Sequence, residues 1–412
     1  MKFEKWTLAL AAAGVVSLTC AAQAEEKASS VMTALSSTTL SGYVDTSAAW
    51  NFGTGNANVP PYKFNSPSKS DGFNLDVVQL RIEKPLDESE WAAGYRVDLW
   101  AGPDANTLGT QSVLSTGRGD FAIRQAYVAL RAPVLNGLDF KVGVFDSIVG
   151  YESVESPNNP NYTRSYGHSI EPQTHTGILT SYRFSDLVSA SFGVANTVGP
   201  VINSRAFAPV QPVNPYAESY KTYMGSIAVT APESMGFLSG STLYGGVVNG
   251  FNNSVVGSGL PMPSFNAYAG GTIATPVTGL RLGAAGDLMK VDSNVLGTKT
   301  EADIWSIAGY ASFQATEKLS LHGRFEYVTG DIDQGLPGVT VGNFGRGNAI
   351  YAATATAQYD LWKNVITRVE FRWDHVEHGQ AFGGTVNGPS TIAGGADRAN
   401  AFLLAANIIY KF

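Results

Sequence analysis

The sequence has one cysteine, Cys20, and it lies close to the N-terminus. The rest of the chain therefore offers no thiol for a disulfide, a thiolate metal site or a cysteine nucleophile. Charged residues are also scarce, because Asp, Glu, Lys and Arg make up 15% of the 412 residues. Beyond residue 24 there is no apolar run of about 18 residues, so the sequence predicts no membrane-spanning helix.

Residues 1–24 have the pattern of a secretory signal peptide. Two lysines precede an apolar stretch at residues 6–19, and Ala22 and Ala24 form a small-residue cleavage site. An N-terminal membrane anchor is disfavoured, because this stretch is shorter than the roughly 20 residues that a span needs. Removing the segment changes 27 basic and 34 acidic residues to 25 and 33, a net charge of −8. This acidity argues against nucleic acid as a partner.

Beyond that segment, apolar and polar residues alternate in runs that recur to the end of the chain. Val369 and Phe371 share one face, for example, while Glu370 and Arg372 take the other. Alternation with a period of two is typical of β-strands with one apolar face. It predicts sixteen strands, which begin near Leu40, Phe73, Trp91, Phe121, Leu138, His175, Leu187, Tyr220, Ser241, Ser264, Leu280, Glu301, Leu319, Asn348, Val365 and Asn400.

The connections between these runs alternate between short turns and long loops rich in Gly, Pro, Asn and Ser. A meander with short turns at one rim and long loops at the other has this pattern, as in bacterial outer-membrane barrels. Closing the sheet pairs the backbone groups that an open sheet would leave unsatisfied in hydrocarbon. The sequence therefore predicts an all-β, closed antiparallel transmembrane barrel of about 16 strands at residues 40–412, after a short segment at residues 25–39. A soluble β-sandwich is the less favoured alternative.

Several stretches resemble the OmpL-like β-barrel porin family. They are GYVD at 42–45, GFNLDVV at 72–78, AGYRVD at 93–98, QAYVALRAP at 125–133, GVFD at 143–146, NNPNYTR at 158–164, HTG at 175–177 and GGVVNG at 245–250. The resemblance covers nearly all of residues 40–412. It implies a pore in the bacterial outer membrane, reached by export through the periplasm, and it implies no catalytic residues.

The polar faces of the predicted strands carry charges of both signs that would point into the barrel. The candidates for the pore lumen are Arg96, Asp98, Arg324, Glu326, Arg368, Glu370, Arg372 and Asp374. In a water-filled lumen such charges stay hydrated and set the field that a passing solute meets. The alternative for any one of them is that it only neutralises a neighbour on the next strand.

The third long loop, residues 150–174, is among the longest and carries several charged side chains. A barrel of about sixteen strands leaves an aqueous channel, and general porins often narrow that channel with an inward-folded third loop. We therefore expect this loop to form the constriction, with an outward surface loop as the alternative. The residues placed there are Glu152, Glu155, Arg164, His168 and Glu171.

The last strand ends on an aromatic residue, Phe412, with apolar residues at alternate positions before it. This pattern resembles the signal that hands bacterial barrels to the barrel assembly machinery. His375 and His378 lie three apart, so on a strand they face opposite sides and do not converge on a metal. No nucleophile or nucleotide-binding motif stands out. The sequence thus predicts no enzyme, no metal site and no cofactor.

Together these features predict an outer-membrane porin that lets small hydrophilic solutes or ions diffuse through its lumen. Outer-membrane lipid would cover its outer face. A homotrimer is common for porins of this size, and no residue pattern decides for or against one. The alternative function is a structural or adhesin-type barrel with a blocked lumen. Net acidity hints at a cation preference, although charges in loops outside the pore could dominate.

Overall fold

The computed structural model describes residues 31–32, 37–53, 55–64, 66–87, 89–110, 119–206, 219–252, 262–295, 298–332, 348–384 and 396–412. The predicted signal peptide and most of the segment at residues 25–39 lie outside these ranges. Within them, no helix has the length and apolarity needed to cross a bilayer.

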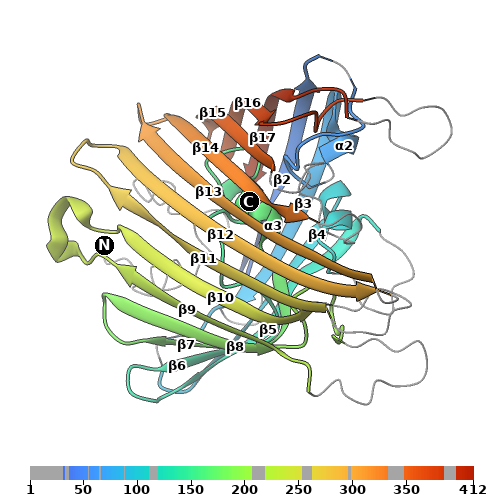
Figure 1. Ribbon diagram of the computed structural model, residues 1–412. Coiled ribbons are helices and arrows are strands. Elements are labelled where there is room, and N and C mark those ends of the chain that lie inside the picture. The colour runs from blue at the N-terminus through green and yellow to red at the C-terminus, as the bar shows by residue number, and fades with distance from the viewer. Residues whose placement is uncertain are drawn as a thin grey trace.

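Sixteen antiparallel strands form the wall of one closed barrel. Figure 1 shows how these strands curve around the interior. They are β2 (Thr39–Asn51), β3 (Gly72–Lys84), β4 (Ala92–Ala101), β5 (Phe121–Ala132), β6 (Leu138–Asp146), β7 (Thr174–Arg183), β8 (Val188–Ala195), β9 (Thr222–Thr230), β10 (Thr242–Asn252), β11 (Met262–Ala274), β12 (Leu280–Val295), β13 (Thr298–Gln314), β14 (Leu319–Ile332), β15 (Asn348–Trp362), β16 (Val365–Val376) and β17 (Asn400–Lys411). A further strand of two residues, β1 (Val31–Met32), pairs with the start of β2.

Each barrel strand pairs with the next along the chain, and β17 pairs with β2 to close the sheet. Ala405 lies opposite Ala49 in this last pairing. Closure leaves no unpaired edge, as a sheet in hydrocarbon requires. The predicted fold class and strand number are confirmed, and the largest error in a strand start is three residues, Glu301 against Thr298.

Short turns join the strands at one rim, and long loops join them at the other. The short-turn rim includes the helix η4 (Glu233–Leu238), between β9 and β10. The long loops carry α2 (Ser66–Lys69), η2 (Pro103–Thr107), η3 (Ser156–Asn158) and α3 (Tyr166–Ile170). In Figure 1, α3 lies behind the strands, within the outline of the barrel.

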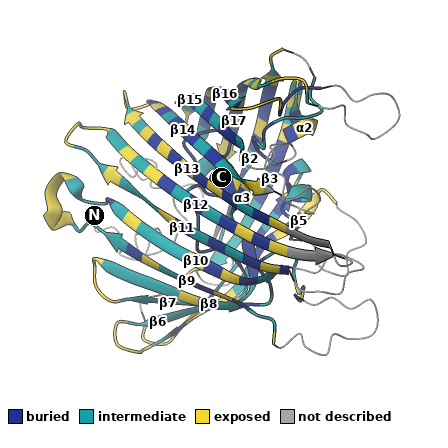
Figure 2. Cartoon of the chain, in the orientation of Figure 1, coloured by how far each residue is buried: buried dark blue, intermediate teal, exposed yellow. Residues whose placement is uncertain are grey.

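The two faces of the wall differ as the alternating pattern predicts. On β16, Val369 and Phe371 are exposed on the outer face, whereas Arg368, Glu370 and Arg372 are buried on the inner face. Figure 2 shows the same alternation as stripes across the strands. Exposed aromatic residues lie near both rims, as in the girdles of outer-membrane barrels. They include Trp50, Phe73, Phe121, Tyr223 and Phe402 near the long-loop rim, and Trp91, Phe184, Phe313, Trp362 and Tyr410 near the short-turn rim.

Candidate functional site

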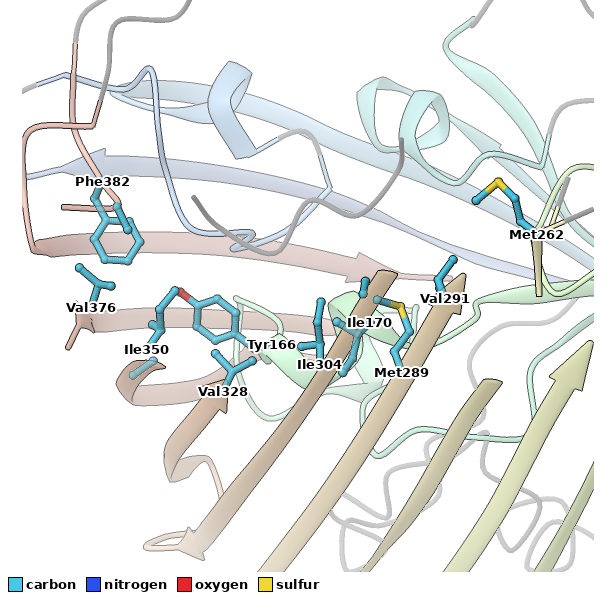
Figure 3. Close-up of a cluster of buried hydrophobic side chains, with 13 residues drawn as sticks. Tyr166, Ile170, Met262, Met289, Val291, Ile304, Val328, Ile350, Val376 and Phe382 are labelled. Atoms are coloured by element: carbon cyan, nitrogen blue, oxygen red, sulfur yellow. The ribbon is translucent and has the colours of Figure 1, made fainter. Parts of the chain in front are cut away.

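The loop between β6 and β7, residues 147–173, folds into the barrel instead of away from it; we call it the inward loop. Its helix α3 packs against β12, β13 and β14. Figure 3 shows Tyr166 and Ile170 of α3 beside the inward side chains Ile304 and Val328. The inward loop therefore crosses the interior of the barrel and rests on the far part of the wall.

Local hydrogen bonds give the inward loop its shape. The Ser165 hydroxyl caps α3 by accepting from the His168 backbone N–H at 3.0 Å, a standard way to satisfy a free helix N–H. The Asn159 amide donates to the carbonyl oxygens of Ser153 and Glu155, both at 2.7 Å. Pro157 lies in η3, where its fixed φ suits the first turn of a helix. These residues make the loop a folded element of its own.

Arg324 on β14 holds the middle of the inward loop. Its Nη1 lies 2.9 Å from Glu152 Oε1 and donates to the Thr163 carbonyl oxygen at 2.9 Å. Its Nε lies 2.8 Å from Glu326 Oε2 on the same strand. Glu326 in turn accepts from the Tyr166 backbone N–H at 2.6 Å. The side chains of Arg324, Glu152 and Glu326 are all buried, so these charge-assisted bonds take the place of hydration.

The inward face of β16 binds the loop backbone directly. Glu370 accepts from the backbone N–H groups of Tyr162 and Thr163 at 2.6 and 2.9 Å. Arg368 donates to the carbonyl oxygens of Ser156 and Asn159 at 3.2 and 2.7 Å. The Arg368 cation thus binds loop carbonyl oxygens, and the Glu370 carboxylate binds loop N–H groups. Each of these buried backbone groups therefore has a hydrogen-bond partner of opposite charge.

Arg372 and Asp374, also on the inward face of β16, add further contacts to the loop. We call the inward residues of β14 and β16 that hold the loop the clamp: Arg324, Glu326, Arg368, Glu370, Arg372 and Asp374. Arg372 donates to the Arg164 carbonyl oxygen at 2.6 Å and pairs with Asp374 at 2.8 Å. The Tyr166 hydroxyl donates to Asp374 at 3.0 Å. The Arg164 guanidinium turns back on its own loop, to the carbonyl oxygens of Tyr162 and Val154. The Arg164 guanidinium therefore shapes the loop, and among the described residues its hydrogen bonds stay within the loop, whereas its carbonyl oxygen accepts from the wall.

Glu155 fixes the other side of the inward loop to three neighbouring strands. It lies 3.2 Å from Arg96 on β4 and 3.1 Å from Arg124 on β5, and it also pairs with Arg81 on β3. Asp98, also on β4, joins the same three guanidinium groups. Arg124, which the alternating pattern did not single out, sits beside a register shift in β5. Such an irregularity turns a side chain to a face that strict alternation does not predict.

His168 and Glu171 lie where the inward loop returns towards β7. Burial lowers the pKa of His168 to about 3, so its ring stays neutral. Its Nδ1 lies 3.7 Å from Glu171 Oε2. Burial, and then the neighbouring Asp287 carboxyl on β12, raise the pKa of Glu171 well above its ordinary value. The same proximity gives a side-chain hydrogen bond between Glu171 and Asp287, which favours the protonated form of Glu171.

The first long loop adds a second buried network that the sequence did not reveal. Lys63 lies 2.6 Å from Asp45 on β2 and 3.3 Å from Asp76 on β3. Lys69 in α2 lies 2.6 Å from Asp76 and also pairs with Asp104 in η2. Lysine is rarely buried unless it is paired, and no sequence spacing links these loop lysines to aspartates on three other elements.

The structure differs in one respect from the expectation of hydrated lumen charges. Arg324, Glu326, Arg368, Glu370, Arg372 and Asp374 face the interior, but their side chains are buried against the inward loop. The physical reason is that loop backbone and Glu152 replace water as their partners. Arg96 stays partly accessible and Asp98 is buried beside it. The inward charges that remain partly accessible lie towards the short-turn rim.

Phe412 lies at the seam where the barrel closes. Its backbone N–H donates to the Gly42 carbonyl oxygen at 3.0 Å, and its carbonyl oxygen accepts from the Gly42 N–H at 2.9 Å. A side chain at position 42 would collide with the Phe412 ring. The last residue thus adds one more backbone pair to the β17–β2 pairing.

With this geometry established, comparisons with known proteins give the family. The sequence model of the family described as "Putative beta-barrel porin-2, OmpL-like" matches residues 37–412. The chain belongs to this family. Membership in this OmpL-like porin family places the chain in the bacterial outer membrane, and family and fold are those of a channel and not of an enzyme. No curated protein sequence matches the chain.

Solved structures support the fold of this OmpL-like porin. An anion-selective porin from Comamonas acidovorans aligns with a TM-score of 0.58 at 13% identity, over 91% of this chain and 99% of its own. The outer membrane channel DcaP of Acinetobacter baumannii gives 0.56 at 11% identity, over 91% and 97%. OmpT of Vibrio cholerae gives 0.54 at 13% identity, over 93% and 100%. Among the described residues, no group of three or more His, Cys, Asp or Glu is arranged to hold a metal ion.

Proposed function

We propose that this porin lets small hydrophilic solutes or ions diffuse passively across the outer membrane. The observation that carries the proposal is the inward loop, which is held across a closed barrel. A buried charge pair to β14 and hydrogen bonds to β16 fix one side, and charge pairs to β3, β4 and β5 fix the other. A loop fixed at both sides narrows a lumen to a defined size without closing the barrel.

Each predicted constriction residue has a role in this proposal. Glu152 and Glu155 anchor the loop to opposite parts of the wall. Arg164 stabilises the turn of the loop through its carbonyl contacts. His168 and Glu171 fix the return of the loop towards β7. The wall residues Arg324, Glu326, Arg368, Glu370, Arg372 and Asp374 serve as the clamp, while Arg96 keeps part of its surface for a passing solute.

The proposal extends to assembly and surroundings. Residues 1–24 direct export, and the C-terminal strand ending at Phe412 is recognised by the barrel assembly machinery. Lipid contacts the exposed apolar outer face between the aromatic girdles. One V. cholerae OmpT structure is described as a trimer form, and a homotrimer is our proposal for this chain too.

A barrel with a blocked lumen, acting as a structural element or adhesin, is the second candidate. It is favoured by the apolar clusters beneath the loops. One of them joins Tyr166 and Ile170 of the inward loop to Ile350 on β15 and to Phe382 in the last long loop. Such packing fills part of the interior on the long-loop side.

Single-channel conductance in a planar bilayer separates the two candidates. The mature protein is refolded in detergent, its barrel is verified by circular dichroism, and it is then inserted into the bilayer. Stepwise, sustained currents support the diffusion pore. A folded barrel that inserts and carries no current rejects the pore and favours the blocked barrel.

A further inference from the structure

We propose that the pore selects anions, and that Lys141 on β6 and Arg281 on β12 determine this preference. The inference rests on the proposed diffusion function and names the class of solute that it favours. An anion preference is the opposite of what the net charge of the chain, −7, would suggest. The net charge of a whole porin counts loops and turns that a solute in the lumen does not meet, so the charges on the inner surface decide.

The inner surface that stays partly accessible lies between the inward loop and the short-turn rim. It carries the cations Arg81, Arg96, Lys141, Arg183 and Arg281, and the carboxylates Glu83, Asp139, Asp146 and Asp360. The numbers of cations and carboxylates are too similar to decide between anions and cations. What matters is which of these charges already have a partner.

Most of the carboxylates are neutralised in place. Asp139 lies 2.7 Å from Arg131, a buried cation on β5. Asp146 lies 2.5 Å from Arg124. Glu83 lies 3.9 Å from Arg96. Asp360 on β15 is the accessible inward carboxylate for which the described residues supply no salt bridge.

Two of the cations have no such partner. Lys141 lies over the Tyr127 ring, with its Nζ 5.0 Å from the ring centroid, and no carboxylate of the described residues lies within salt-bridge distance of it. No carboxylate of the described residues lies within salt-bridge distance of Arg281 either. Its Nη1 is buried without a hydrogen-bond partner in the described part of the chain, although the residue as a whole is half-buried. Burial raises the pKa of Tyr151 in the inward loop, and the Arg281 charge opposes this rise. The two unpaired cations therefore lie on well-separated strands of the wall. Arg281 is two residues from Gly283, against which Tyr151 of the inward loop lies.

The paired cluster around Glu155 adds to the same field. The side chains of Arg81 and Arg96 are 20% and 13% exposed, whereas Asp98 is 0% and Glu155 is 7% exposed. The guanidinium groups thus face the accessible side and their carboxylates lie behind them. A charge at the water boundary acts on a passing ion at shorter range than the opposite charge buried behind it. The cluster presents a positive face although its formal charges nearly balance.

Reversal potentials in a KCl gradient test the proposal. Wild type, Lys141→Gln, Arg281→Gln and the double variant are compared in planar bilayers. Lys290→Gln is the matched control, because Lys290 is an exposed lysine on the outer face of β12, paired with Asp303. We expect chloride to permeate better than potassium in wild type, each single variant to lower the chloride-to-potassium ratio by about twofold, and the control to leave it unchanged. Asp360→Asn should raise the ratio.

The outcomes separate this inference from the proposed function. Open channels that favour potassium in wild type overturn the anion preference and leave the diffusion pore standing. Open channels with the same ratio in wild type and in the double variant overturn the role of Lys141 and Arg281. A wild-type barrel that is folded but silent rejects the pore itself, and the anion preference with it. Circular dichroism of each variant verifies that it has folded.

Discussion

Arg324 Nη1 on β14 lies 2.9 Å from Glu152 Oε1 in the inward loop, with both side chains buried and 172 residues between them in the sequence. This pair joins a loop that begins after β6 to a strand on the other side of the barrel. The pair therefore fixes the loop to the wall through buried opposite charges. The position of the inward loop should therefore depend on a few buried pairs.

Arg324→Met should loosen the inward loop. The change leaves Glu152 buried without its cation and leaves Glu326 with Arg372 alone, at 3.7 Å. Breaking a buried pair in this way costs about 3–5 kcal/mol. We expect noisier currents of higher mean conductance in bilayers and a lower denaturant midpoint in detergent. Lys290→Met is the control, because its pair with Asp303 is exposed and exposed ion pairs contribute little to stability. Equal midpoints and currents for Arg324→Met and wild type would show that the pair does not hold the loop.

How far the sequence predicts this arrangement depends on the range of the interactions. Alternation along each strand places Arg324 and Glu370 on the inner face correctly, because the side-chain period of a strand is local. The pairing of Arg324 with Glu152 is not local, and only the folded loop brings them together. The sequence leaves two alternatives for this loop, an inward fold and an outward surface loop, because its polar composition is compatible with both. The burial of the wall charges follows from that fold and could not be read from the strands alone.

Glu370→Gln should weaken the same clamp from β16. Glu370 accepts from the N–H groups of Tyr162 and Thr163, and hydrogen bonds to a charged acceptor contribute roughly 1.5–3 kcal/mol each. A neutral amide keeps the size but loses the charge, so we expect more frequent current fluctuations at a nearly unchanged open conductance. Glu377→Gln, at an exposed position beyond β16, is the control. The prediction fails if both variants show the same fluctuation rate.

Deleting residues 157–161 should raise the conductance. The deletion shortens the inward loop and removes Asn159, which accepts from Arg368, and Asn161, which donates to Thr356. A shorter loop covers less of the lumen. A deletion of equal length at residues 200–204, in the loop after β8, controls for loop shortening in general. Unchanged conductance in the 157–161 deletion would contradict a constriction formed by this loop.

Glu171→Gln should change how the stability of the barrel depends on pH. The Glu171 pKa is raised by burial and by Asp287, so the protonated form stabilises the fold fully below the unfolded pKa near 4.5. This stabilisation is lost as the pH rises through the higher folded pKa, by about 1.4 kcal/mol per pH unit at most. Glutamine keeps the hydrogen bond to Asp287 and does not ionise. The variant should therefore gain stability relative to wild type as the pH rises above 4.5.

Denaturant midpoints of the two proteins in detergent, from about pH 4 to about pH 9, provide the test. His168 acts in the opposite direction, because its folded pKa is about 3 and the unfolded value is 6.5, so its contribution is lost as the pH falls. That contribution is the same in both proteins and cancels in their difference. A difference that stays constant over the whole range would mean that Glu171 ionises equally in the folded and unfolded chains.

Phe412→Ala should lower the amount of barrel assembled in cells without changing the pore that is formed. The hydrogen bonds of Phe412 with Gly42 at the closing seam use backbone atoms, which alanine retains, although the ring that lies against Gly42 is lost. Protein refolded in detergent should therefore conduct like wild type. Assembly in cells should fall, because the terminal aromatic ring is the proposed recognition signal. Tyr410→Ala, two residues earlier on the same exposed face of β17, separates this effect from the loss of any aromatic residue in the last strand. Two quantities are measured for each variant: the amount of folded protein in outer-membrane fractions of cells, and the single-channel conductance of protein refolded in detergent. Equal assembly of both variants, or altered conductance of Phe412→Ala, would assign the residue a structural role at the seam.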